Sequence, residues 1–429
     1  MRLSHVAWNL AGLAVPLAVA ALTVPQLLAN VGHEKFGLLA LAWGLIGYAS
    51  GLDLGIGRAL TQRVAGLRGA GKDGEVPDVL ATAGRITLIA GLFFGLLVVL
   101  AVPAGAPGWV HAVSTPRSEI ATAVLLLALA LPAQAMSATY RGLNEAYLNF
   151  RGISLLRAAL GVVNFAGPFF VSLATPHLGW LVLPLVASRL LSLAIYRALA
   201  WRCIRQGGEA RTGHYQPATA RALFAFGGWV TVSSVVSPVL VQADRFTIGA
   251  VLSAAAVSAY VLPYEVVVQS LVLAGAVSSV MFPGLSRLLL QDPHGWRPYF
   301  LKWLRRVAVL MGLVCGLLAV MLPWLLQAWI GDELQPVSVM VGQILCLGVF
   351  ANALGTLFYA LLHARGRADI TARMHLAELP VFLMLLGLLI SQYGLPGAAW
   401  AWTLRMVADA SLLAFFSLRH SPQRAVATP

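Results

Sequence analysis

Ionisable side chains lie deep inside long apolar stretches of this 429-residue sequence. Arg189 and Arg405 are near the middle of two such stretches, Glu265 is inside a third, and Asp409 follows Arg405 by one helical turn. A charge at the centre of a bilayer costs about 2.5–3.5 kcal/mol on insertion scales, so it usually faces a cavity or a partner. These residues are therefore candidates for contact with a substrate or a coupling ion inside a membrane.

A second set of ionisable residues lies nearer the ends of the apolar stretches. Residues of both sets also have structural explanations that involve no substrate or ion. Arg405 and Asp409 are spaced to neutralise one another along one helix face. Arg85 and Arg157 are close enough to a membrane surface for their charged ends to reach water. Asp53 is placed to pair with Arg58 at a helix end. The full second set is Asp53, Arg85, Arg157, Asp244, Arg245 and Glu378.

Two patterns that resemble sites in soluble proteins carry no such function here. The segment 66–72 fits the nucleotide-binding pattern G-x-x-x-x-G-K, but Asp73 stands where Ser or Thr would ligate magnesium, and no buried strand precedes it. Cys203, Cys315 and Cys346 are far apart, which gives neither a disulfide framework nor the spacing of a metal site. The sequence predicts no cofactor and no bound metal.

The elements that position the charged residues are membrane-spanning helices. Hydrophobic residues make up 59% of the chain and charged residues 10%, against about 25% charged in soluble domains. The apolar residues come in blocks of about twenty without alternation, as expected for helices that cross about 30 Å of hydrocarbon. The predicted spans are 6–30, 37–57, 79–103, 119–139, 152–174, 179–201, 222–248, 257–281, 307–329, 338–361, 376–392 and 395–417.

The distribution of Lys and Arg predicts the orientation. Alternate connections hold many of these residues, as in 58–72, 202–221 and 287–306, whereas the opposite connections hold only Lys35 and Arg117. Because basic residues concentrate on the cytoplasmic side, both termini are predicted to be cytoplasmic. The net charge of +13 therefore reflects the basic cytoplasmic connections, which also attract anionic lipids. It does not indicate a protein that binds nucleic acid.

The two halves of the chain resemble one another. The segments 177–202 and 393–420 correspond, and each carries one arginine near mid-depth, Arg189 and Arg405. Six spans in each half make the repeats parallel, related by an axis along the membrane normal. We therefore predict an all-α polytopic membrane protein of about twelve helices in two lobes around a central cavity. The predicted parts are a lobe 1–205, a cytoplasmic linker 206–221 and a lobe 222–429.

Several stretches resemble a known family. The segment 25–65, which contains DLGIGRA at 53–59, is similar to the first helical hairpin of bacterial oligosaccharide flippases. The segment 226–270, with its GGWVTVSS, DRFTIG and AAAVSAY patterns, opens the second half in a similar way. These flippases form the polysaccharide transporter branch of the multidrug/oligosaccharidyl-lipid/polysaccharide exporter superfamily. The resemblance covers nearly the whole chain.

The resemblance implies a function and roles for the charged residues. It implies movement of a polyprenyl-pyrophosphate-linked oligosaccharide to the outer leaflet of the bacterial inner membrane, for O-antigen or related polysaccharides, driven by an H⁺ or Na⁺ gradient. Arginine suits phosphate oxygens, so Arg189 and Arg405 are predicted to hold the pyrophosphate, together with further basic residues. The predicted substrate-binding residues are Arg58, Arg85, Arg157, Arg189, Arg245 and Arg405. The predicted ion-coupling residues are Asp53, Asp244, Glu265, Glu378 and Asp409.

Two other functions stay open on the sequence. A cation-coupled multidrug antiporter of the same superfamily would have a cavity rich in acidic groups. A membrane-embedded polysaccharide polymerase or glycosyltransferase would present its catalytic groups on a sizeable loop, which this chain lacks. A self-contained cavity permits a monomer, and association with the proteins that polymerise the polysaccharide is an open alternative.

Overall fold

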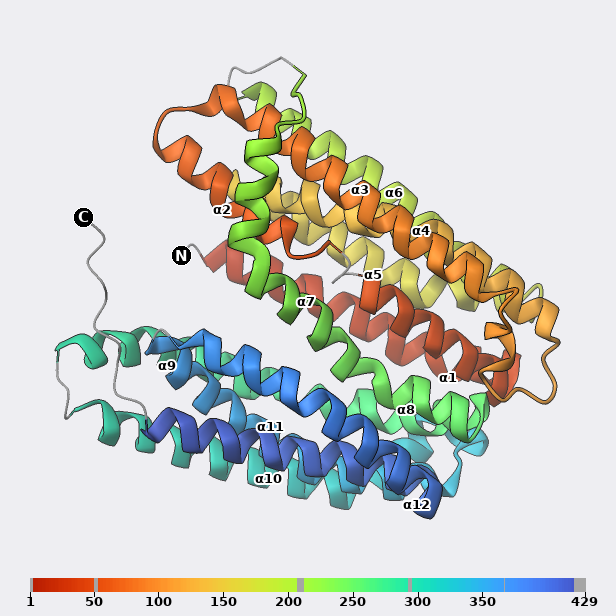
Figure 1. Ribbon diagram of the computed structural model, residues 1–429. Coiled ribbons are helices and arrows are strands. Elements are labelled where there is room, and N and C mark those ends of the chain that lie inside the picture. Colours follow the sequence, from red (N-terminus) through yellow and green to blue (C-terminus); the bar gives the residue numbers. More distant parts are fainter. Residues whose placement is uncertain (1–2, 50–52, 207–211, 292–294, 366, 420–429) are drawn as a thin grey trace. The chain divides into compact units, whose positions relative to one another are not determined.

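The computed structural model describes residues 3–49, 53–206, 212–291, 295–365 and 367–419, and within these ranges every long element is a helix and no strand is present (Figure 1). The helices are α1 Leu3–Ala49, α2 Ile56–Gly69, α3 Val76–Ala101, α4 Arg117–Ala146, α5 Phe150–Ser172, α6 Leu178–Gln206, α7 Pro217–Val251, α8 Ala254–Val268, α9 Leu271–Gln291, α10 Trp296–Ile330, α11 Pro336–Ala364 and α12 Ala368–Arg419.

By length and composition, nine helical segments in the described part of the chain can cross a membrane. Two of them, in α1 and α12, each contain two predicted spans, because the backbone leaves the helical conformation at Gly32 (φ 76°) and at Gly394 (φ 62°). Glycine has no Cβ and adopts such positive φ angles at little cost. The predicted all-helical architecture with many membrane spans is confirmed by these helices.

Two predicted boundaries differ from the structure. The predicted span 37–57 is too long: α1 ends at Ala49, and Leu54 (φ 54°) and Gly55 (φ 71°) turn the chain into α2. The span 257–281 is interrupted, since α8 ends at Val268 and α9 begins at Leu271. At this break the Ser270 amide donates to the Val267 carbonyl at 3.2 Å, a spacing of three residues in place of four.

Helix α2 occupies a segment that the sequence predicts to be a basic connection. Its apolar side chains Ile56, Leu60, Val64 and Leu67 recur at helical spacing and are buried, so the arginines between them lie on the other faces. With 14 residues, α2 is too short to cross a bilayer and escapes a search for apolar blocks of twenty.

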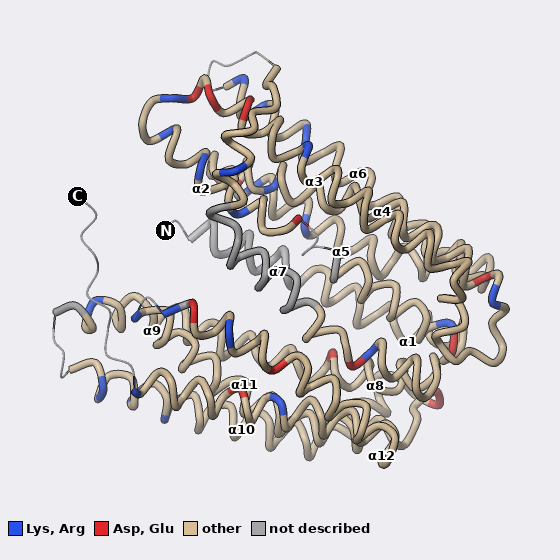
Figure 2. The backbone as a smooth tube through the Cα atoms, viewed as in Figure 1, with Lys and Arg blue, Asp and Glu red and all other residues tan. Residues whose placement is uncertain are grey.

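The chain divides into two compact units, which are 1–242 with 253–255, and 243–252 with 256–429. In the first unit α4 packs against α2, α3 and α6, and α5 packs against α1 and α6 (Figure 1). In the second, α11 packs against α9, α10 and α12. Within each unit the Lys and Arg residues gather towards one end of the helices (Figure 2). The predicted lobes and their linker at 206–221 stay a prediction.

The outer faces of these helices are apolar. In α10 the large side chains at positions 309, 313, 317, 320 and 324 follow helical spacing and are all exposed. Hydrocarbon tails rather than water are the solvent for such a face, since it offers no polar group. Along this apolar stretch α10 therefore presents a face suited to lipid.

Close packing of α2 against α4 at two glycines generates the first testable prediction. A Cβ atom at Gly142 would overlap the backbone carbonyl oxygen of Gly57. We expect Gly142→Ala to lower the free energy of unfolding by about 1–3 kcal/mol, because neither helix can move without disturbing its core. The midpoint of thermal unfolding in detergent measures this change.

The matched control is Gly66→Ala, also in this region of the first unit. A Cβ atom at Gly66 meets nothing within 4 Å. Alanine is the better helix former, so this variant is expected to be as stable as the wild type or slightly more stable. Equal midpoints of thermal unfolding for Gly142→Ala and Gly66→Ala would contradict the close approach of α2 to α4 at Gly142.

Candidate functional site

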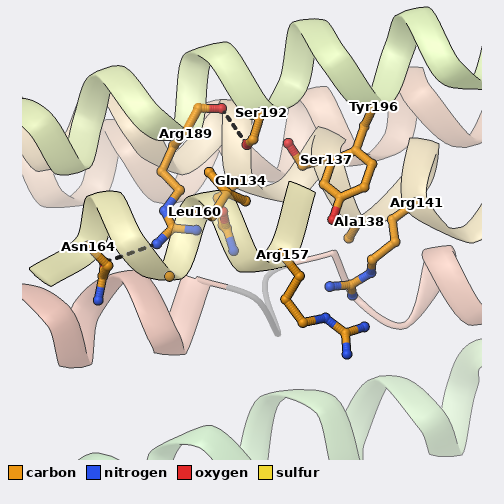
Figure 3. Close-up of a pocket in the computed structure, with 11 residues that line it drawn as sticks. Gln134, Ser137, Ala138, Arg141, Arg157, Leu160, Asn164, Arg189, Ser192 and Tyr196 are labelled. Atoms are coloured by element: carbon orange, nitrogen blue, oxygen red, sulfur yellow. Dashed lines mark hydrogen bonds between the residues drawn. The ribbon is translucent and has the colours of Figure 1, made fainter. Parts of the chain in front are cut away.

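A cavity in the first unit brings together three arginines from three helices. Arg141 comes from α4, Arg157 from α5 and Arg189 from α6, and the cavity holds about 260 Å³ (Figure 3). The cavity has room for a small charged group. Its remaining lining residues are Gln134, Ser137, Ala138, Leu160, Gly161, Asn164, Ser192 and Tyr196.

Arg189 is held by a neutral partner. Its Nη2 donates to Oδ1 of Asn164 at 3.2 Å, and the backbone carbonyl of Asn164 in turn accepts a hydrogen bond from Trp43 Nε1 at 3.1 Å. Nε of Arg189 is buried and has no hydrogen-bond partner among the described residues. An amide partner fixes the guanidinium without neutralising its charge, so Arg189 keeps the ability to bind an anion.

The cavity is basic as a whole. No Asp or Glu is among the described residues that line it. Arg141 forms a half-exposed pair with Glu145 at 3.7 Å along α4, which is worth little because it is screened by solvent. Arg157 is exposed at the edge of the cavity. Three guanidinium groups thus face one space that contains hydroxyl and amide groups but no acid.

A second polar cluster lies in the second unit, at the junction of α7 and α8. The Tyr260 hydroxyl donates to Asp244 at 2.8 Å, and both side chains are fully buried. Arg245 donates through Nη2 to Glu265 at 2.7 Å and lies 5.1 Å from the ring centroid of Tyr264. Each charge in this cluster has a partner of opposite charge or a hydrogen-bond donor, so the cluster holds α8 against α7.

A third cluster joins the two halves of α12. Arg405 Nε lies 3.9 Å from Oε2 of Glu378, and Asp409 Oδ1 lies 3.9 Å from Nε2 of His375. A cavity of about 620 Å³ opens beside Glu378 and Arg405. Its walls are mostly apolar, and Arg367 and Arg373 also line it. Unlike Arg189, Arg405 therefore faces a carboxylate.

Asp53 has a structural role in the DLGIGRA segment. Its carboxylate accepts hydrogen bonds from the backbone amides of Gly55 at 3.1 Å and Gly57 at 3.0 Å, at the start of α2. Burial raises the pKa of this carboxyl above its ordinary value, although both hydrogen bonds and the charge of Arg141 oppose the rise. The first amides of a helix lack partners within it, so Asp53 stabilises this end of α2.

In the structure the predicted site residues do not form one site but lie in several separate locations. Of the predicted substrate-binding residues, Arg157 and Arg189 line the same cavity in the described part of the chain. Arg58 is exposed on α2, and Arg85 lies 5.5 Å from the ring centroid of Tyr215. The roles predicted for Arg58, Arg85, Arg245 and Arg405 in substrate binding, and for Asp53, Asp244, Glu265, Glu378 and Asp409 in ion coupling, stay predictions. The segment 66–72 forms the end of α2 and the following turn.

Sequence reasoning missed Arg141, Asn164 and His375. Hydropathy places Arg141 in a cytoplasmic connection, but α4 continues to Ala146 and carries it beside the cavity. Asn164 has no charge and so escapes a search for buried ionisable groups. Its position eight residues before the end of α5, inside an apolar span, is the available signal.

Comparisons with known proteins agree with this architecture. The family described as "Polysaccharide biosynthesis protein" matches residues 5–289. The chain is 30% identical over 419 residues to the Shigella flexneri protein named "Putative O-antigen transporter", with 96% of each covered. It is 21% identical over 387 residues to the lipopolysaccharide biosynthesis protein WzxC of Escherichia coli, with 89% of this chain and 73% of that protein covered.

A solved structure supports the fold. An inward-facing multidrug resistance MATE family transporter of the MOP superfamily matches with a TM-score of 0.73 at 12% identity, covering 96% of this chain and 97% of the other. At this identity the likeness concerns the fold alone. It confirms the predicted class, an all-helical protein that crosses the membrane many times.

The buried pair of Tyr260 and Asp244 generates a prediction about stability. In Tyr260→Phe the carboxylate of Asp244 loses the hydroxyl that donates to it. A buried acceptor left without its partner costs about 1–3 kcal/mol, so we expect a lower midpoint of thermal unfolding. The control Tyr393→Phe removes a hydroxyl from an exposed side chain and is expected to leave the midpoint unchanged. Equal midpoints for the two variants would show that the hydrogen bond contributes nothing.

Proposed function

Since the chain belongs to the polysaccharide biosynthesis protein family, we propose that it is a flippase for a polyprenyl-pyrophosphate-linked oligosaccharide. It is a transporter rather than an enzyme, and it moves the lipid from the cytoplasmic to the outer leaflet of the inner membrane. The glycan serves O-antigen or a related surface polysaccharide. The relative named as an O-antigen transporter supports this substrate class.

The observation that carries the proposal is the basic cavity in the first unit. A pyrophosphate group carries several negative charges on oxygens that match the planar donors of arginine. Arg141, Arg157 and Arg189 face one cavity whose volume suits such a group. The contact proposed for this cavity is with the pyrophosphate.

Electrostatics give this cavity a preference for anions. A pyrophosphate that leaves water for the membrane interior loses hydration, and arginine side chains can replace it with charge-assisted hydrogen bonds. Arg189 offers an Nε that has no hydrogen-bond partner among the described residues. The same arrangement repels an organic cation, which weighs against the multidrug antiporter as the alternative.

Orientation and ion coupling complete the proposal. The gathering of Lys and Arg at one end of each unit supports cytoplasmic termini and a cytoplasmic face at that end (Figure 2). We propose alternating access between two lobes, driven by a gradient of H⁺ or Na⁺. The two parallel repeats and a monomeric state are part of this proposal, and the polysaccharide polymerisation proteins are the proposed partners.

Transport by arginine variants tests the proposal. Purified protein in vesicles is supplied with a polyprenyl-pyrophosphate-linked oligosaccharide, and its arrival in the opposite leaflet is measured. A hydrogen bond to a charged group contributes about 1.5–3 kcal/mol, which corresponds to roughly tenfold or more in rate. We therefore expect Arg189→Gln and Arg157→Gln each to slow transport at least about tenfold, and the double variant to abolish it.

Two comparisons make this test specific. Arg63→Gln removes the same charge from an exposed position on α2 and is expected to transport at the wild-type rate. Arg189→Lys keeps the charge but loses the planar donors, so we expect an intermediate rate. Wild-type transport by the Arg157/Arg189 double variant would refute the pyrophosphate assignment. Efflux of a small organic cation by the wild type, without movement of the glycolipid, would favour the antiporter.

A further inference from the structure

The hinge at Gly394 places four ionisable residues opposite one another in the second unit. Glu378 lies sixteen residues before Gly394, and Asp409 lies fifteen residues after it. At 1.5 Å per residue both are about 22–24 Å from the hinge, so the two halves of α12 bring them to the same depth. His375 and Arg405 lie one turn away from Glu378 and Asp409 respectively. The cluster of His375, Glu378, Arg405 and Asp409 therefore results from the register of one helical hairpin.

The cluster has one more carboxylate than it has permanent positive charges. Glu378 and Asp409 face a single guanidinium, Arg405, since His375 is neutral unless it takes up a proton. The nitrogen of His375 and the carboxylate oxygens of Glu378 and Asp409 lie within 4.8 Å of one another. Burying an uncompensated negative charge costs free energy. Binding one further positive charge would therefore stabilise the site.

Glu378 shows where this charge would be held. Its side chain is 9% exposed, and neither carboxylate oxygen receives a hydrogen bond from the described residues. The buried Oδ1 of Asp409 has no hydrogen-bond partner there either. Oxygens of the two carboxyl groups lie within 4.8 Å of one another, so a proton on one group can be shared with the other after a small movement. Buried carboxylate oxygens usually accept hydrogen bonds, so these oxygens have unused capacity for a bound proton.

Neighbouring elements contribute further charged and titratable groups. From α11, His363 lies close enough to His375 for electrostatic interaction, and Gly355 leaves room for Asp409, whose Oδ2 would be 3.8 Å from a Cβ at that position. From α7 and α8, Asp244 and Tyr264 interact electrostatically with Arg405. Asp244 adds to the negative charge around Arg405. This charge further favours the binding of a positive charge at the site.

We propose that His375, Glu378 and Asp409 form a proton-binding site, with Arg405 as its fixed counter-charge. The bound proton forms the O–H bond of one carboxyl group and is hydrogen-bonded to the other, and on release it passes to His375 or to water. Arg405 occupies one side of Glu378, which disfavours a divalent metal ion. An imidazole is a poor ligand for Na⁺, which prefers oxygen, whereas it exchanges protons readily near neutral pH.

The adjoining cavity supplies a path for the proton. It extends from Glu378 and Arg405 to Arg367, which directly precedes α12, and to Arg373 near the start of α12. The connection before α12 is cytoplasmic in the predicted topology. The site therefore exchanges protons with the cytoplasm in this conformation, and a proton taken up from the outer side in another conformation would be released inwards. This inference rests on the proposed function, to which it adds the coupling ion and its site.

Infrared spectroscopy of the full chain in lipid nanodiscs tests the site without any substrate. Exposed carboxyl groups are ionised above about pH 5, so a protonated-carboxyl band that persists above this pH reports buried carboxyl groups. We expect Glu378→Gln to remove one component of this band, and Asp332→Asn, which changes an acid in the connection after α10, to leave the band unchanged. A band unaffected by both Glu378→Gln and Asp409→Asn would overturn the proposal, as would a band that Na⁺ abolishes at constant pH.

Transport distinguishes a failure of this inference from a failure of the proposed function. In vesicles with an imposed proton gradient, Glu378→Gln is expected to move glycolipid only at the rate that the wild type shows without a gradient. Arg189→Gln is expected to be slow under both conditions and to keep the infrared band. Full acceleration of Glu378→Gln by the proton gradient would overturn the proton site and leave the flippase intact. A titrating carboxyl in a wild type that moves no glycolipid would support the site and refute the flippase.

Discussion

The partner of a mid-membrane arginine decides what each unit can bind. Arg189 and Arg405 occupy similar places on the final helix of the two halves, and each faces a polar residue on the preceding helical segment. In the first unit this residue is Asn164, an amide, so the positive charge is held in place and stays available. In the second unit it is Glu378, a carboxylate, so the charge is compensated and the nearby Asp409 is left in excess. In our proposal, two like arginines therefore serve different sites, an anion site beside Arg189 and a proton site beside Arg405.

The helices hold these pairs at the right depth. The apolar side chains on outer faces such as that of α10 contact lipid. An ionisable group within a span is tolerated where it faces the interior and has a partner there. The pairing of Asp53 with the first amides of α2 and the contact of Gly57 with Gly142 fix α2 against α4, which carries Arg141. Asp53, although acidic and near a membrane boundary, is therefore engaged in holding the scaffold of the basic cavity.

Much of the fold could be predicted from the sequence, because a bilayer imposes a length and an apolar composition on each span. The position of Arg189 in such a span is enough to identify it as a candidate site residue. The partners could not be found in this way, since hydropathy gives the depth of a residue but not the rotation of its helix. His375 was missed for this reason, whereas Asn164 was missed because it carries no charge. Helix α2 was missed because its apolar face is narrow and its length is short.

The central claim is that the pyrophosphate binds in the first unit, and an experimental structure with bound polyprenyl-pyrophosphate-linked oligosaccharide in nanodiscs tests it most directly. The account predicts that the two phosphates lie among Arg141, Arg157 and Arg189, with an oxygen within hydrogen-bond distance of Arg189 Nε. The glycan is expected outside this cavity. Phosphates bound at Arg405, with the Arg189 cavity unchanged, would contradict the account.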